Sequence, residues 1–167
     1  MSLFVTGQRM AVVWAGAALG VAAALEIPAL LLLGRLAGRV PELTLLASGC
    51  VAAVVYYAAM VRVSSPVALI GLQVLNGWFF ATVAGVGLTM FQRLIPRPGL
   101  ATGLYVNTRR LGSVVSGPVI ALGAGLAPGY SGVFIVCAVL STVALAALVA
   151  VAARRGSAAV ASGPQSA

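Results

Sequence analysis

Long apolar stretches alternate with short polar ones along nearly the whole chain. Five stretches stand out, at residues 11–34, 42–61, 66–92, 101–126 and 130–153. Each is long enough for a helix to cross the hydrocarbon core of a bilayer, which takes about 20 residues. None shows the strict alternation of barrel strands, and unpaired backbone groups are too costly in lipid for open strands. The pattern therefore predicts an all-α integral membrane protein with five transmembrane helices.

Composition fits a membrane environment. Hydrophobic residues make up 62% of the 167 residues and charged residues 7%, and mean hydropathy is +1.13, whereas soluble domains are roughly one quarter charged. The ten basic residues are all Arg, scattered between apolar stretches rather than gathered on one face. We therefore expect the lipid bilayer as a partner and no nucleic acid.

The positions of the Arg residues predict an orientation. One side of the five spans collects six of them, against Arg9 and Arg62 on the other side; the six are Arg35, Arg39, Arg93, Arg97, Arg154 and Arg155. Cytoplasmic loops carry the excess of basic residues. We expect residues 1–10 outside, a five-helix transmembrane domain over 11–155 and a small, polar, disordered cytoplasmic tail over 156–167.

The side chains that common enzymes use are missing from the sequence. There is no His, no C-x-x-C motif and no Walker-type loop, and Cys50 and Cys137 lie inside apolar stretches, where a thiol behaves as a small hydrophobe. We therefore expect no enzymatic activity, no metal and no cofactor.

Four segments resemble a known family. They are LEIPALLLLG at 25–34, GRLAGR at 34–39, LQVLNGWFFATVAGVG at 72–87 with MFQRLIP after it, and YVNTRRLGSVVSGP at 105–118. They are similar to the C-terminal half of major facilitator superfamily transporters, and within these to the bacterial sugar efflux group. Gly38 departs from the superfamily pattern, which has Asp at that place in the loop.

The resemblance implies a partial C-terminal half bundle, helices eight to twelve, with MSLFVTG similar to the end of helix seven. It also implies a missing N-terminal half as partner, the bacterial inner membrane, and proton-coupled efflux of sugars or sugar-like molecules. Two alternatives remain open: a multidrug-type exporter, and a non-transporting membrane remnant or scaffold.

One carboxylate lies inside the first apolar stretch. Glu26 is the single charge between residues 11 and 34, and charges at the bilayer centre cost about 2.5–3.5 kcal/mol and face a bundle interior or a wet cavity. It is either a structural carboxylate bonded to a neighbouring helix or a cavity residue that binds a sugar hydroxyl or takes up a proton. We favour the cavity role, with Glu26 as the candidate for proton coupling, because Gln or Ser would make a structural bond at lower cost.

The stretch at 66–92 has two distinct faces. Gly77, Ala81 and Gly85 repeat every fourth residue and predict close helix packing. Beside them run Gln73, Asn76 and Phe80, followed by Ala84, Gly87 and Phe91. Amides match adjacent hydroxyls and rings match the apolar face of a sugar, so Gln73, Asn76 and Phe80 are candidates for substrate binding. The alternative is interhelical bonding and core packing.

The stretch at 101–126 contributes Asn107 and Arg110, which share a face, with Arg109 on another. Either Arg could snorkel to the cytoplasmic interface. The resemblance favours Arg110, with Asn107, as substrate-binding and Arg109 as the snorkelling side chain. An ion pair between Arg110 and Glu26 is a further hypothesis that the sequence leaves open.

Overall fold

The computed structural model describes residues 12–127 and 131–161, with side chains described over 16–127 and 131–154. Within these residues it is all-helical, as predicted, and holds five helices: α2 (Val12–Leu36), α3 (Glu42–Met60), α4 (Pro66–Leu94), α5 (Pro98–Leu126) and α6 (Ser131–Ala161). The predicted outer segment at residues 1–10 lies outside the described part.

Helix ends follow local chemistry. Pro66 and Pro98 occupy the first turns of α4 and α5, where the N–H that proline lacks would have no helical partner. Helix α5 therefore begins three residues before the predicted stretch at 101. Helix α6 continues to Ala161, so residues 156–161 of the predicted tail are helical, in an Ala-rich segment that contains no proline. Residues 162–167 lie outside the described part.

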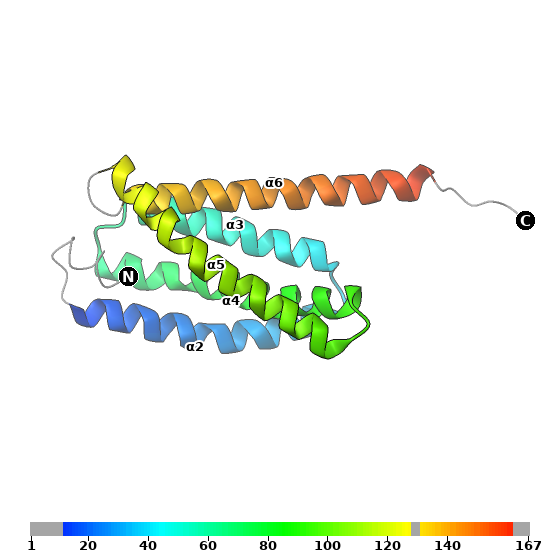
Figure 1. Ribbon diagram of the computed structural model, residues 1–167. Coiled ribbons are helices and arrows are strands. Elements are labelled where there is room, and N and C mark those ends of the chain that lie inside the picture. The colour runs from blue at the N-terminus through cyan, green and yellow to red at the C-terminus, as the bar shows by residue number, and fades with distance from the viewer. Residues whose placement is uncertain (1–11, 128–130, 162–167) are drawn as a thin grey trace, which may run out of the picture.

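Helix α4 is the centre of the bundle. It packs against α2, α3 and α5, while α6 packs against α3 and α5. Figure 1 shows α2 and α4 side by side, α3 and α6 side by side, and α5 crossing obliquely in front of them. We call the face of α4 that carries Gln73, Asn76 and Phe80, followed by Ala84, Gly87 and Phe91, the polar stripe.

Two clusters of buried side chains hold the helices together. One contains Ala18, Tyr56 and Leu69 from α2, α3 and α4, with Phe134 of α6 against it. The other, nearer the ends of α2 and α4, contains Leu33, Leu45, Ala81 and Val86. Cys50 is buried and Cys137 half-buried, both as free thiols, which fits their expected role as small hydrophobes.

Four of the five helices meet the length and hydropathy expected of a membrane span. These spans are Gly16–Leu36, Glu42–Met60, Pro66–Leu94 and Ser131–Arg154. Helix α5 is as long as α4 but less apolar, since it carries Asn107, Arg109 and Arg110. Large side chains such as Leu31 and Val114 are 68% and 73% exposed, as lipid-facing surfaces are in a membrane bundle.

Candidate functional site

The small residues Gly77, Ala81 and Gly85 of α4 lie against α2. A Cβ built on Gly77 would be 3.3 Å from Leu25 Cβ and 3.4 Å from the carbonyl oxygen of Ala22. One built on Gly85 would be 3.3 Å from Leu30 Cδ2, and Ala81 between them is 0% exposed. The small side chains let the two helices approach closely at this line.

Glu26 lies beside this contact line. Its backbone nitrogen is 3.7 Å from the Cβ built on Gly77, and its side chain is half-buried. Within the described part of the chain, its carboxylate forms no hydrogen bond or ion pair. A carboxylate at the middle of a span with no partner there is unusual, because such groups are costly in lipid unless paired or hydrated.

The flank on which Glu26 lies follows from the helical repeat. Leu25, Pro28 and Leu32 of α2 line an apolar groove with Val74 and Trp78 of α4, with a volume of about 330 Å³. At 100° per residue, Glu26 lies on the side of the α2–α4 contact line that faces away from this groove. Asn76 and Phe80 of α4 lie on that same side. The carboxylate and the polar stripe therefore share one flank of the α2–α4 pair.

Gln73 is enclosed in the bundle. It is 0% exposed, its Nε2 donates to the carbonyl oxygen of Leu69 at 3.0 Å, and its Oε1 accepts from Asn76 Nδ2 at 3.1 Å. The Tyr56 hydroxyl of α3 lies near the same amide. In this structure Gln73 is not accessible to a solute, whereas Asn76 is half-buried and Phe80 is 43% exposed.

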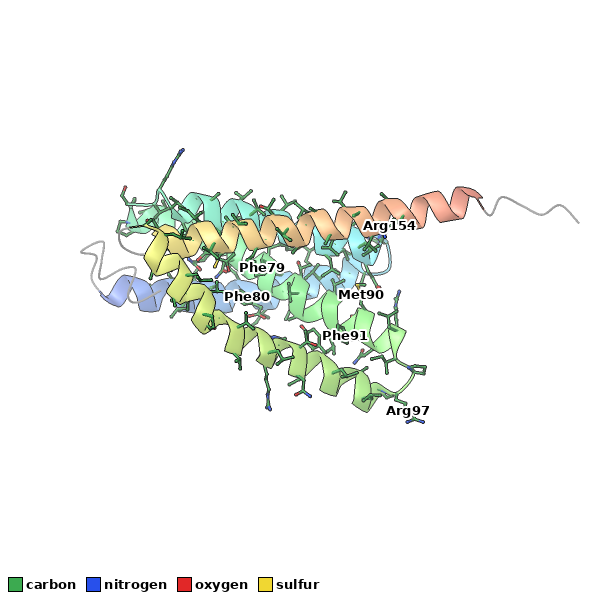
Figure 2. The ribbon with its side chains drawn as sticks, turned by 45° about the horizontal axis from the view of Figure 1, so that its top comes forward. Phe79, Phe80, Met90, Phe91, Arg97 and Arg154 are labelled. Carbon is green, nitrogen blue, oxygen red and sulfur yellow. The ribbon has the colours of Figure 1, made fainter. Side chains whose placement is uncertain are left out.

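Helix α5 covers the C-terminal part of the polar stripe, around Gly87 and Phe91. Tyr105, 8% exposed, donates its hydroxyl to the carbonyl oxygen of Val83 at 2.8 Å, and its ring lies against Gly87. Phe91 meets the same ring edge-on at a centroid distance of 5.7 Å, and Figure 2 shows Phe91 between the α4 and α5 ribbons. The sequence analysis did not identify Tyr105 as a contact between α5 and α4. Gly87 was a signal for it, because a residue without a side chain lets another helix approach closely.

Asn107 and Arg110 lie on the far side of α5 from this contact. They follow Tyr105 by two and five residues, which turns them about 200° and 140° around the helix, and both are exposed. Arg109, four residues on, is exposed too but lies beside the Tyr105 hydroxyl. The substrate candidates of α5 thus face away from α4.

The proposed charge pair is not formed in this structure. Arg110 lies about 7.5 Å along antiparallel α5 from Tyr105 at 1.5 Å per residue, which places it near the depth of Phe80 and Glu26. However, α2 and α5 are not among the closely packed helix pairs. In the described part, neither Glu26 nor Arg110 has an ion-pair partner.

An ion pair that the sequence did not suggest joins the ends of α3 and α4. Arg93 Nη1 and Glu42 Oε1 are 2.9 Å apart, with side chains 67% and 19% exposed. Among the described residues, no cluster of three or more His, Cys, Asp or Glu side chains could hold a metal ion.

Comparison with known proteins identifies relatives of the chain. It is 36% identical to sugar efflux transporter A of Dickeya chrysanthemi over 132 residues, covering 78% of this chain and 34% of the relative. It is 38% identical to sugar efflux transporter A of Escherichia coli K12, with 78% and 33% covered. It is also 38% identical to sugar efflux transporter B of Salmonella typhimurium, with 66% and 28% covered.

The chain spans about a third of the length of the curated relatives it matches. No solved structure and no protein-family model matches it. The identities and the helical membrane fold confirm the family that the sequence segments indicated. The chain belongs to the bacterial sugar efflux transporters and corresponds to a C-terminal portion of such a protein.

Proposed function

We propose that the chain is the C-terminal part of a secondary transporter that exports sugars or sugar-like molecules in exchange for protons, rather than an enzyme. The observation that carries the proposal is the half-buried Glu26 carboxylate, which has no hydrogen bond or ion pair in the described part of the chain. The names of its relatives support the substrate class.

The proposed mechanism gives each side chain a role. A proton taken up by Glu26 removes a charge whose presence in the bilayer is costly, so protonation and deprotonation favour different surroundings for α2. Asn76 and Phe80, on the same flank, offer an amide and a ring to the solute. Asn107 and Arg110 would bind it from the side of the missing N-terminal half, since carriers of this kind bind substrate between two halves.

The proposed setting is the bacterial inner membrane, with the N-terminus outside and the C-terminus in the cytoplasm. Helices α2 and α4 end next to Arg35 and Arg93, and Arg154 lies at the end of the apolar span of α6. These ends lie on one side if the three helices span in parallel, and an excess of Arg marks the cytoplasmic side.

The test uses a chimera in which this chain replaces the matching C-terminal residues of the Escherichia coli relative. Export is measured as uptake of a labelled sugar panel into inside-out vesicles, with and without an imposed pH gradient. Glu26→Gln should abolish gradient-driven export while leaving the chimera in the membrane, because the amide keeps the shape of the side chain but cannot titrate.

The matched control is Glu42→Gln, which removes the other acidic side chain of the sequence. It should retain gradient-driven export, since Glu42 pairs with an exposed Arg at the helix ends. Equal export by the Glu26→Gln chimera and the parent would remove Glu26 from the mechanism. Transport of cationic dyes with no sugar transport would replace the sugar class with a multidrug one.

A further inference from the structure

A chain of polar side chains runs from the core of the bundle to its flank. Tyr56 and Gln73 are 4% and 0% exposed, and Asn76, three residues further along α4, is half-buried. The Asn76 amide donates to Gln73 Oε1 at 3.1 Å. The outermost member of this chain is thus attached to a group that is itself fixed inside the protein.

Gln73 is held rigidly. Its Nε2 donates to the carbonyl oxygen of Leu69 at 3.0 Å, and its Oε1 accepts from Asn76 Nδ2 at 3.1 Å, while the Tyr56 hydroxyl lies nearby. Buried amides are satisfied by such bonds because an unpaired one would cost free energy. Rotation of Gln73 would break these contacts together, so its Oε1 stays at one position.

The bond to Gln73 determines what Asn76 can offer. A carboxamide has two N–H donors and one carbonyl acceptor in a single plane. One donor is used on Gln73, which restricts rotation of the amide and leaves the Oδ1 acceptor and the second N–H available to a ligand. Phe80, one helical turn further and 43% exposed, lies on the same face of α4.

We propose that Gln73 is a positioning residue that orients the Asn76 amide, so that its free oxygen and N–H bind two adjacent hydroxyl groups of a sugar. This proposal rests on the proposed function for its substrate class. It differs from a direct role for Gln73, whose side chain no solute reaches in this structure. An acceptor and a donor at fixed places select for the orientation of neighbouring hydroxyls, which a freely rotating amide does not.

The first experiment needs no transport. The sequence contains two Asn residues, Asn76 and Asn107, so the chain labelled with ¹⁵N on Asn side chains gives two amide signals by NMR in detergent. The Asn76 amide proton that is bonded to Gln73 should exchange with water at least tenfold more slowly than the amide protons of exposed Asn107. Gln73→Leu should bring the Asn76 rate close to that of Asn107. Equal rates in the parent chain, or no effect of Gln73→Leu, would overturn the proposal.

The second experiment measures selectivity in the chimera, with methyl glucoside and its monodeoxy analogues as probes. Gln73→Leu should raise KM about tenfold, the effect of one or two lost neutral hydrogen bonds, leave kcat within about twofold, and reduce discrimination against a deoxy analogue. The double variant Gln73→Leu/Asn76→Ala should be no worse than Asn76→Ala alone, because both remove the same oriented amide.

The matched control is Thr82→Val, which removes another fully buried polar group of α4 whose hydroxyl bonds to the carbonyl oxygen of Trp78. It should leave KM and discrimination unchanged. Additive effects of the Gln73 and Asn76 substitutions would contradict the positioning role. If the parent chimera moves none of the glucosides but the NMR result holds, the sugar function fails while the positioning of Asn76 stands.

Discussion

The contact of Tyr105 with α4 gives the sharpest prediction about how the bundle is held together. The buried residues of α5 are Ala101, Tyr105 and Gly123, and Tyr105 is the one hydrogen-bonded to α4. Tyr105→Phe removes that bond, but the Val83 carbonyl keeps its partner within the helix, so no acceptor is left unpaired. The expected loss of unfolding free energy is therefore about 1 kcal/mol.

Removing the ring has a larger effect. Tyr105→Ala also removes the edge contact with Phe91 and the packing against Gly87. Truncating a buried aromatic residue costs about 3–5 kcal/mol in soluble proteins. We expect about 3 kcal/mol here, since lipid tails supply no hydrophobic drive toward closing the helix interface.

Gly87→Ala probes the same contact from the other side. The added Cβ would lie 3.3 Å from Tyr105 Cε2, so the ring must move by a few tenths of an ångström, at a cost of about 1 kcal/mol. The same substitution in a Tyr105→Ala background should cost nothing. Unfolding by SDS in mixed micelles, followed by circular dichroism, measures all four variants. Equal costs of Gly87→Ala in both backgrounds would refute the contact.

Three further predictions concern the ion pair of α3 and α4, a glycine of α5 and transport by the chain alone. Glu42→Gln should cost about 1 kcal/mol in low salt, since only the Arg93 side of the pair is well exposed, and less in 1 M salt, where the Debye length is about 3 Å; SDS unfolding at both salts tests this. Gly123→Ala should reduce folded yield, because its Cβ would lie 2.6 Å from Val133 Cα, whereas Gly117→Ala, with open space around it, should not. The chain alone should export no sugar from vesicles, and co-expression with the N-terminal part of the Escherichia coli relative should restore export.

The helices could be predicted from the sequence because their signals are local. The start of α4 at Pro66 and the end of α5 at Leu126 match the predicted stretches, since proline and loss of apolar residues act on neighbouring backbone. The end of α6 was missed by several residues because hydropathy marks the membrane boundary, whereas an Ala-rich helix can continue beyond it.

The surroundings of the site residues could not be predicted from periodicity. Helical spacing places Gln73, Asn76 and Gly87 on one arc of α4, but it does not say which helix covers each part of that arc. Tyr56 of α3 and Tyr105 of α5 close over its two ends, and both come from distant parts of the sequence. Accessibility of a side chain depends on these neighbours, so Gln73 is inside the bundle while Asn76 remains open.

The low hydropathy of α5 follows from the same arrangement. Asn107 and Arg110 lie on a face that no other described helix covers, and an Arg facing hydrocarbon near the bilayer centre costs about 2.5–3.5 kcal/mol. A helix that borders a wet cavity needs such residues, whereas one that borders lipid excludes them. Since the relatives are about three times as long as the matched region, we infer that their remaining portion covers this face. In the proposed transporter, the polar side of α5 would then form one wall of the space between the two halves.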